Sequence, residues 1–365
     1  MISDTEVLAA VEARRDDAVE VVRFVHAHPE LGHEERECSR FVADRLETAG
    51  FVVERGAGGM ETAFRAVLEG ASPGRSVGFV CLYDAVAAVR PDGSIDAVHS
   101  CGHGPIAGGV TSAALAFADR RDSLAGRIVV VGCPADEIHA ANTALRGGGK
   151  ALSAETGLWD GVDAVLYAHP EFIDTVSLES RWMQRLGLLV SGCRSLVGEP
   201  EPPLRAAQAV LGANEPDVMV ERLVLDGDVE EGTGLVLHAD VLVFADSEVE
   251  LARRVAGVKR RVDDGAWTDG RVVQGVRPDP AVTQAVASAF EAAGRSFVAD
   301  PPPLPFATDF GNISRRAPAA LIGVGRPGGW AFHTDEGAAQ FASDAGIEAA
   351  ITIGRVLALA TTRLL

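Results

Sequence analysis

The first part of the chain alternates between helical and strand-like patterns of hydrophobic residues. Apolar residues recur at helical spacing over Thr5–Val25 and Glu35–Ala49. Strand-like runs follow at Phe51–Glu54, Thr62–Leu68 and Val77–Leu82, and the last run is almost entirely apolar. A continuous apolar run of this length is typical of a strand that is buried on both faces of a sheet.

The same alternation continues through the next 85 or so residues. It predicts a helix at Pro105–Ala118, a strand at Arg127–Cys133, a helix at Ala141–Ser153 and a strand at Ala164–Ala168. Strands that alternate with helices favour an α/β sheet with helices on both faces. We therefore expect this part of the chain to form an α/β domain.

The pattern changes after Val176. Residues 178–190 predict a long strand, and the elements that follow are a helix at Pro203–Leu211, strands at Val218–Leu225 and Leu235–Ala245, a helix at Glu248–Val262 and a strand at Arg271–Gln274. This order is typical of a small α+β sandwich with an antiparallel sheet and its helices on one face.

The last part of the chain returns to the first pattern, with a helix at Pro280–Ala293, a short strand at Ala319–Gly323 and a long helix at Ala339–Leu364. We therefore predict a large α/β domain in two parts, 1–177 and 277–365. A smaller α+β domain of residues 178–276 is inserted between them.

Charge and composition exclude some partners. The 365 residues include 33 Lys and Arg against 52 Asp and Glu, which gives a net charge of −19 and disfavours nucleic acid as a partner. The N-terminus lacks the order of a signal peptide, and Arg355 and Arg363 interrupt the apolar C-terminal tail, so we expect a cytoplasmic protein without a membrane span. Lysine occurs only at Lys150 and Lys259, which we attribute to a general preference for arginine.

The candidate catalytic and metal-binding residues lie where strands are predicted to end. Five cysteines form an odd and sparse set, which indicates reduced thiols rather than a disulfide framework. The residues at strand ends are Cys101, His103, Asp136, Glu137, His169 and His333. Each is a weak signal alone, but ligands gather at the carboxyl ends of strands in α/β sheets. A thiolate, a carboxylate and three imidazoles suit a divalent ion such as zinc, cobalt, nickel or manganese.

Several motifs add a resemblance to this picture. They are HAHPELGHEERECSRFVADRLETAGF, YDA at 83–85, VHSCGHGPIAGG, CPADE, GGGKALSAETGLWDGVDAVLYAHP, TDFGNIS and FHTDEGAAQF. In this order they resemble the metal-dependent amidohydrolases of peptidase family M20, a family that includes aminoacylases, auxin-conjugate hydrolases and aminobenzoyl-glutamate hydrolases. The match covers most of the large domain. The resemblance implies that the large domain is the catalytic domain and that the inserted domain is a lid and dimerisation domain.

The resemblance implies a role for each of these residues. One or two divalent ions would be held by five ligands: Cys101, His103, Glu137, His169 and His333. Asp136 would be the general base, and Asp84 would orient a ligand histidine. This agrees with the chemistry, since a divalent ion activates a water and polarises a carbonyl while a nearby carboxylate moves the proton.

The chain departs from the family at two places. Relatives usually have Glu-Glu where this chain has Asp136-Glu137, so the predicted base is one methylene shorter. In the small domain Leu196 lies near the place where relatives carry a histidine, and Arg194 is our candidate for a replacement that binds substrate.

Asp309 and Asn312 match the family motif at the wall of the active site and are predicted to contact substrate.

We therefore predict a metal-dependent hydrolase of the amide bond in an N-acyl or N-aroyl amino acid or a dipeptide, acting as a homodimer on a small molecule. Three alternatives stay open at this point. They are hydrolytic deamination of an aromatic amine, a non-catalytic descendant that binds metal or ligand, and a thiol enzyme that uses Cys101 with His103 or His99.

Overall fold

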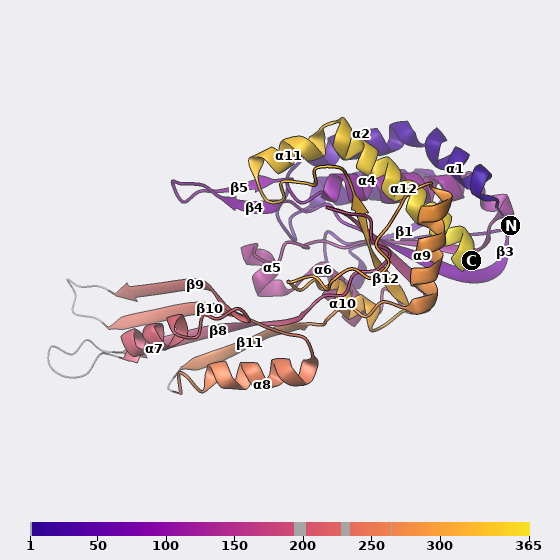
Figure 1. Ribbon diagram of the computed structural model, residues 1–365. Coiled ribbons are helices and arrows are strands. Elements are labelled where there is room, and N and C mark those ends of the chain that lie inside the picture. The colour runs from indigo at the N-terminus through magenta and orange to yellow at the C-terminus, as the bar shows by residue number, and fades with distance from the viewer. Residues whose placement is uncertain (1, 193–201, 228–233, 264) are drawn as a thin grey trace. The chain divides into compact units, whose positions relative to one another are not determined.

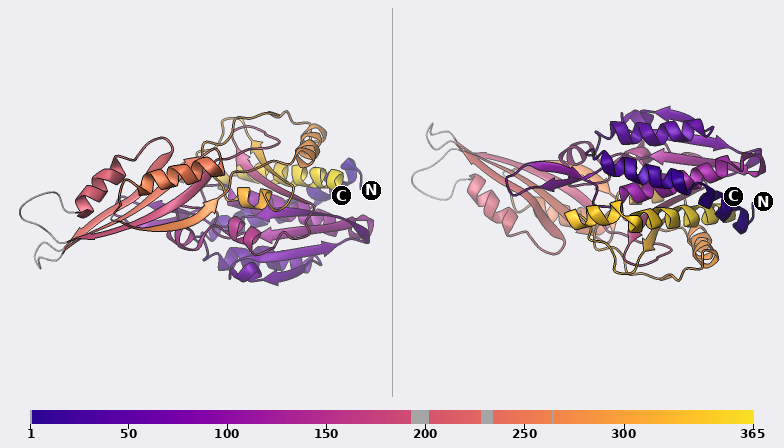
Figure 2. Two further views of the ribbon diagram at one scale, coloured as in Figure 1. Left: turned by 90° about the horizontal axis from the view of Figure 1, so that it is seen from below. Right: turned by 90° about the horizontal axis from the view of Figure 1, so that it is seen from above.

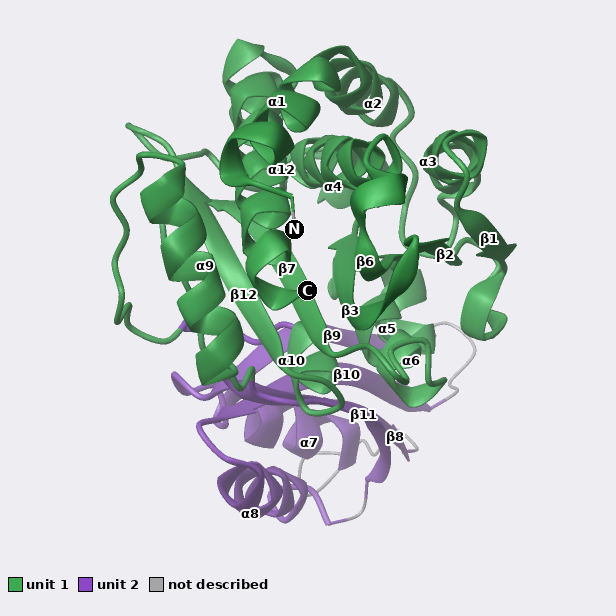
Figure 3. Ribbon diagram, turned by 90° about the vertical axis from the view of Figure 1, so that its right-hand side faces the viewer, with its two compact units in different colours: residues 1–179, 276–303, 309–365 green, residues 180–275, 304–308 purple. Residues whose placement is uncertain are grey.

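The computed structural model describes residues 2–192, 202–227, 234–263 and 265–365. The chain divides into two compact units (Figure 3). Unit 1 consists of residues 1–179, 276–303 and 309–365, and unit 2 consists of residues 180–275 and 304–308. Residues 304–308 therefore pack with unit 2, although the sequence pattern assigned them to the large domain.

A six-stranded mixed sheet forms the centre of unit 1. Its order is β1 (Val52–Arg55), β2 (Phe64–Glu69), β6 (Ala125–Gly132), β3 (Ser72–Cys81), β7 (Ala164–Glu171) and β12 (Ala319–Gly325). The four strands from β6 to β12 are parallel, whereas β1 and β2 are antiparallel to their neighbours. Residues 77–82 are all buried, as the continuous apolar run predicted. The predicted α/β fold class is thus confirmed.

The helices of unit 1 are α1 (Asp4–Ala13), α2 (Arg15–Ala27), α3 (Arg36–Thr48), α4 (His103–Ala118), α5 (Ala141–Arg146), α6 (Gly149–Glu155), α9 (Pro280–Ala292), α10 (Phe310–Ser314), α11 (Asp335–Ala342) and α12 (Asp344–Leu364). Helices α4 and α12 pack against the sheet and against each other (Figure 1), and α1 and α2 pack in turn on α4. A hairpin of β4 (Val86–Val89) and β5 (Ile95–Val98) joins β3 to α4.

Three predicted helices are each broken into two, and the hairpin was not predicted. Gly147, at φ 99°, separates α5 from α6, because a left-handed residue cannot continue a helix. Ser343 is extended, and its hydroxyl accepts a hydrogen bond from the Ala345 amide, so it ends α11 and caps α12. Arg14 separates α1 from α2 and pairs with Asp119 at the end of α4.

Helix α12 is the core helix of unit 1. Among the described residues it is the one helix that is long and apolar enough to cross a membrane by length and composition, yet 72% of its apolar window is buried inside the structure. It approaches α4 closely because both helices carry glycine at the contact. A Cβ on Gly109 would lie 2.7 Å from the Ala350 carbonyl oxygen, and one on Gly354 would lie 3.2 Å from the Gly109 carbonyl oxygen.

Unit 2 is an antiparallel sheet covered by two helices. The strand order is β11 (Ala266–Val273), β8 (Trp182–Gly192), β10 (Leu235–Ala245) and β9 (Val218–Gly227). Helices α7 (Pro202–Leu211) and α8 (Glu248–Lys259) share one hydrophobic core with the sheet and lie on the same side of it (Figure 2). This is the predicted α+β sandwich, although β8 begins four residues later than predicted and β11 five residues earlier.

The contact between α4 and α12 gives a stability prediction. Gly109→Ala should lower the free energy of unfolding by about 1 to 3 kcal/mol, because the new methyl group overlaps α12. Gly257→Ala, in the last turn of α8, is the matched control. Its Cβ would have Arg260 as nearest neighbour at 3.9 Å, so alanine should stabilise that helix by about 0.5 to 1 kcal/mol. Denaturant unfolding followed by circular dichroism measures both, and equal effects of the two substitutions would contradict the packing account.

Candidate metal centre

The parallel strands bring distant segments of the chain to one edge of the sheet. Strands β6, β3 and β7 pair in parallel, with Cys81 opposite Gly132 and Phe79 opposite Leu166. Asp84 follows β3, Glu137 follows β6, and His169 lies near the end of β7. The carboxyl ends of the three strands therefore place these side chains together, as the sequence predicted.

Two further segments complete the cluster. Gly102, at φ 96°, forms the turn into α4, so that Cys101 lies before the helix and His103 is its first residue. A Cβ at Gly102 would lie 2.9 Å from the Pro170 ring, so glycine is also needed for the approach to β7. The His333 amide donates to the Ser100 carbonyl at 2.9 Å, which holds the His333 loop against this turn.

The structure brings the five predicted ligands together in overlapping groups of donor atoms. The Cys101 Sγ is 3.7 Å from His169 Nε2 and 3.4 Å from His333 Nε2. Glu137 places its Oε1 3.7 Å from His103 Nε2 and its Oε2 3.7 Å from His333 Nε2. Three sets of three donor atoms lie within 4.8 Å of one another: Cys101, His103 and His169; Cys101, Glu137 and His333; and His103, Asp136 and Glu137.

The buried Asp84 contacts two of the proposed ligands, His103 and Glu137. It is 1% exposed, and its Oδ2 accepts a hydrogen bond from the Glu137 amide at 3.0 Å. His103 Nδ1 lies 2.7 Å from the Asp84 main-chain oxygen and 3.0 Å from its Oδ1. Nδ1 therefore donates to Asp84, and Nε2 is turned toward Glu137 and Asp136, where it has no hydrogen-bond partner among the described residues.

Burial and mutual pairing shift the pKa values of the cluster. Burial lowers the pKa of His103, but Asp84 and then Cys101 together raise it well above its ordinary value, and the pairing with His103 holds the pKa of Asp84 below its usual value. Burial lowers the pKa of His169 to about 3, so this imidazole is neutral near pH 7. Burial, and then Glu137, raise the pKa of the Cys101 thiol to about 12.

This donor set fits a divalent ion. Thiolate, imidazole and carboxylate are the ligands of zinc and its neighbours, and His103 Nε2 and Glu137 Oε1 are buried without a hydrogen-bond partner among the described residues. A cation would satisfy both atoms and would stabilise the thiolate of Cys101. The raised pKa of Cys101 is the opposite of what an activated thiol nucleophile needs, which disfavours the thiol-enzyme alternative.

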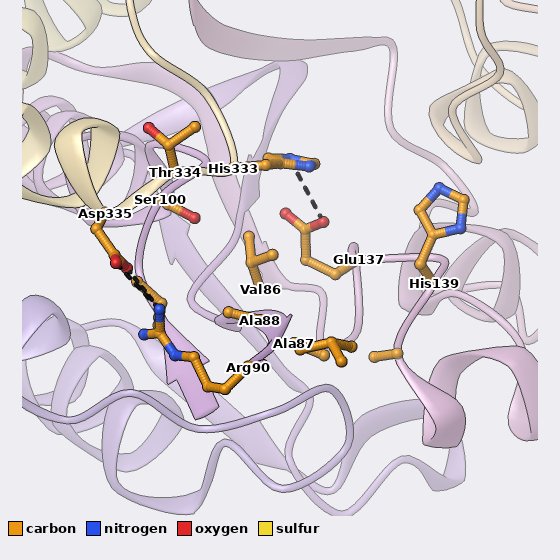
Figure 4. Close-up of a pocket in the computed structure, with 13 residues that line it drawn as sticks. Val86, Ala87, Ala88, Arg90, Ser100, Glu137, His139, His333, Thr334 and Asp335 are labelled. Carbon is orange, nitrogen blue, oxygen red and sulfur yellow. Dashed lines mark hydrogen bonds and ion pairs between the residues drawn. The ribbon is translucent and has the colours of Figure 1, made fainter. Parts of the chain in front are cut away.

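A cavity of about 420 Å³ opens beside Glu137 and His333 (Figure 4). Strand β4 and the end of β5 supply small aliphatic side chains to its wall, and the polar lining comes from Arg90, Ser100, His139, Thr334 and Asp335. Arg90 is paired with Asp335 at 3.0 Å and with Asp96. The β4–β5 hairpin, which the sequence pattern did not predict, thus forms one wall of the space next to the ligands.

The predicted substrate residues have different surroundings. Asp309 is buried at the start of α10, where its Oδ2 accepts a hydrogen bond from the Ala151 amide at 3.0 Å. Asn312 lies in α10 and is 9% exposed. Neither residue lines the cavity beside Glu137. Arg194, and the position Leu196 that motivated it, lie outside the described residues.

Two buried ionisable residues near the cluster were not predicted from the sequence. Lys150 is 0% exposed and pairs with both Asp136 and Asp309. Glu35 is also 0% exposed, and its carboxylate accepts hydrogen bonds from the Ala135 amide and the Thr62 hydroxyl, each at 2.7 Å. A signal for Lys150 was available, because it is one of only two lysines in a chain rich in arginine.

With this geometry in place, comparison with known proteins identifies the class. A model of peptidase family M20/M25/M40 matches residues 82–359, and the chain belongs to this family. The resemblance carried by the sequence motifs is thereby confirmed.

Individual relatives are similar over part of their length. One subunit of the p-aminobenzoyl-glutamate hydrolase of Escherichia coli is 29% identical over 173 residues, which are 44% of this chain and 34% of that protein. The Xaa-Arg dipeptidase of Mus musculus is 32% identical over 188 residues, which are 46% of this chain and 39% of the dipeptidase. The chain thus matches between a third and two fifths of the length of these two curated relatives.

Solved structures share the fold over nearly the whole chain. A dinuclear metal binding peptidase of the M20 family from Bacillus subtilis superposes with a TM-score of 0.69 at 18% identity, covering 95% of this chain and 98% of the peptidase. An aminobenzoyl-glutamate utilization protein from Klebsiella pneumoniae gives a TM-score of 0.64 at 16% identity, covering 97% and 98%.

The buried carboxyl group of Glu35 gives a prediction on pH. Burial, and then Asp84, raise its pKa from the ordinary 4.5 to about 8. Between these values the folded protein binds a proton that the unfolded chain releases, so the free energy of unfolding falls as the pH rises. Since each pKa unit corresponds to about 1.4 kcal/mol, Glu35 should remove a few kcal/mol of stability between pH 5 and pH 8.

Glu35→Gln should flatten this dependence while keeping an acceptor for the Ala135 amide. The measurement is denaturant unfolding of both proteins from pH 5 to pH 8 at one fixed metal load. Glu34→Gln, an exposed neighbour, is the control and should retain the wild-type slope. An unchanged slope in the Glu35 variant would show that this carboxyl group is ionised in the fold.

Proposed function

We propose that the protein is a metal-dependent hydrolase of the amide bond in N-acyl or N-aroyl amino acids or dipeptides. The observation that carries the proposal is the convergence of five donor side chains beside a carboxylate, Asp136, and a cavity. Membership of the M20/M25/M40 family supports it, as do relatives named for p-aminobenzoyl-glutamate, N-acyl-L-amino acids and Xaa-Arg dipeptides.

The residues that would hold one or two ions are the five ligands: Cys101, His103, Glu137, His169 and His333. A divalent ion bound there, zinc, manganese, cobalt or nickel, would lower the pKa of a water molecule and polarise the scissile carbonyl. Two of the donor sets share Cys101, which is compatible with two adjacent ions. The solved Bacillus subtilis relative, described as dinuclear, supports the same arrangement.

Asp136 is the residue that would move the proton. Its Oδ2 lies 3.3 Å from His103 Nε2, at the edge of the donor cluster, and its side chain is 15% exposed. From this position Asp136 can accept a proton from the attacking water and return it to the nitrogen of the leaving amine. Asp84 keeps His103 in the tautomer that donates from Nδ1, so that Nε2 is free to bind an ion.

Two further features are proposed. The family resemblance implies that the inserted domain of residues 178–276 acts as a lid and dimerisation domain, so that the protein would be a homodimer. A cytoplasmic location is proposed from the composition of the chain and not from the family motifs.

Removing the metal should abolish turnover. Purified protein should contain one or two divalent ions per chain, and chelation should remove hydrolysis of a panel of N-acetyl amino acids, dipeptides and p-aminobenzoyl-glutamate. His103→Ala should reduce both metal content and turnover by at least about tenfold, whereas His238→Ala, an exposed histidine of β10, should leave both unchanged. Full activity after chelation would contradict the proposal, and bound metal without turnover would favour the non-catalytic alternative.

Replacing the proposed base should separate catalysis from metal binding. Asp136→Asn keeps the shape of the side chain but cannot accept the proton, so kcat should fall by about 100-fold or more. Metal content should stay at the wild-type value, because Asp136 is not one of the five proposed ligands. Asp122→Asn, on an exposed turn, is the control. Steady-state kinetics with metal analysis tests this, and a kcat within threefold of wild type would exclude Asp136 as the base.

A further inference from the structure

Lys150 is a fully buried cation next to Asp136, at the edge of the proposed metal centre. Its side chain is 0% exposed, and its Nζ lies 2.9 Å from Asp309 Oδ1 and in contact with Asp136 Oδ1. The same Nζ lies over the Tyr167 ring, 5.3 Å from its centroid. A lysine without access to water is costly to a fold unless it is paired, so this position requires its two carboxylates.

The run of three glycines before Lys150 brings it to this position. Gly147 ends α5 in a left-handed conformation. A Cβ on Gly148 would overlap the Asp309 carboxylate, and one on Gly149 would overlap the Pro134 carbonyl. Helix α6 can therefore begin directly against the loop that carries Asp136 only because these positions have no side chain.

The Asp309 carboxylate is held in place through both of its oxygens. It is 1% exposed, and while Oδ1 faces Lys150, Oδ2 accepts a hydrogen bond from the Ala151 amide at 3.0 Å. Both of its oxygens are thus held by the start of α6. Asp136 is less buried, with a side chain that is 15% exposed. While its Oδ1 contacts Lys150, its second oxygen, Oδ2, lies 3.3 Å from His103 Nε2 at the donor cluster.

We propose that Lys150, anchored by Asp309, is a positioning residue that holds Asp136 Oδ1 and thereby directs Asp136 Oδ2 toward the metal centre. The inference rests on the proposed function, because it assigns Lys150 a role only through Asp136.

The alternative is a structural ion pair that stabilises the loop without affecting the reaction. The two roles differ in what they predict for kinetics. A misplaced base slows the chemical step and leaves substrate binding nearly unchanged, and displacement by about 1 Å can cost about 100-fold in rate. A purely structural pair would change the stability of the protein with no specific effect on kcat.

The test uses the metal-loaded full chain with Lys150→Met and with the double variant Lys150→Met/Asp309→Asn. The double variant avoids leaving Asp309 as an unpaired buried charge, and its asparagine can still accept from the Ala151 amide. We expect kcat on the best substrate of the panel to fall by about 10- to 100-fold in both variants. KM should stay within about threefold and metal content at the wild-type value.

Lys259→Met is the matched control, since Lys259 is the other lysine of the chain and pairs with Asp269 in unit 2. Its kinetics should equal those of the wild type. A folded, metal-loaded double variant with kcat within twofold of the wild type would overturn the inference. A parallel loss of metal would also overturn it, because Lys150 would then support the ligands rather than the base.

Crystal structures of the metal-loaded wild type and double variant provide a readout that does not depend on turnover. Asp136 Oδ2 should face the metal centre in the wild type and should be displaced or disordered in the variant. An Asp136 carboxylate in the same position in both structures would refute the inference. If the wild type hydrolyses nothing in the panel, the proposed function fails, but these structures still decide the role of Lys150.

Discussion

The parallel pairing of β6, β3 and β7 is the constraint on which the site depends. It places the residues that follow three strands at a single edge of the sheet, so that the Asp84 carboxylate and the Glu137 amide, 53 positions apart in the sequence, lie 3.0 Å from each other. Asp84 shows the consequence most directly. Following β3, it contacts His103 at the start of α4 and the amide of Glu137 after β6, so one buried carboxylate fixes two proposed ligands.

Close backbone approach is the second requirement of this arrangement. Glycine at position 102 allows the turn that carries Cys101 to approach β7, and Gly148 and Gly149 allow α6 to approach Asp309 and Pro134. Four buried ionisable residues surround the five donors: Glu35, Asp84, Lys150 and Asp309. Groups buried this deeply persist because each has a specific partner, and those partners also hold the loops that carry the ligands.

Much of the fold was predictable because the periodicity is strong. The buried strand at Val77–Leu82 and the inserted antiparallel unit follow from their hydrophobic patterns. The hairpin of β4 and β5 was missed because each strand has only four residues and much of its surface is exposed, which leaves little pattern to detect. The division of Ala141–Ser153 into two helices occurs at Gly147, which has a non-helical φ of 99° and whose carbonyl oxygen lies 2.8 Å from His33 Nε2, a contact that the local sequence does not show.

The site residues that belong to recognisable motifs could be predicted from the sequence. The residues whose role depends on burial could not. Cys101, His103, Glu137, His169 and His333 were all named from the sequence, and the structure gathers them. Nothing in the local sequence shows that Lys150 is buried between two carboxylates, because its partners lie 14 and 159 residues away. Asp309 holds this lysine and the start of α6, and its contact with substrate stays a prediction.

The central claim is that the five donors bind a divalent ion beside Asp136, and anomalous X-ray scattering at the metal absorption edge tests it most directly. Crystals of the metal-loaded protein should show one or two peaks, with a zinc ion about 2.3 Å from Cys101 Sγ and about 2.0 to 2.1 Å from His103 Nε2 or His169 Nε2. A metal-loaded crystal with no peak in this cluster, or with its only peaks elsewhere on the surface, would contradict the account.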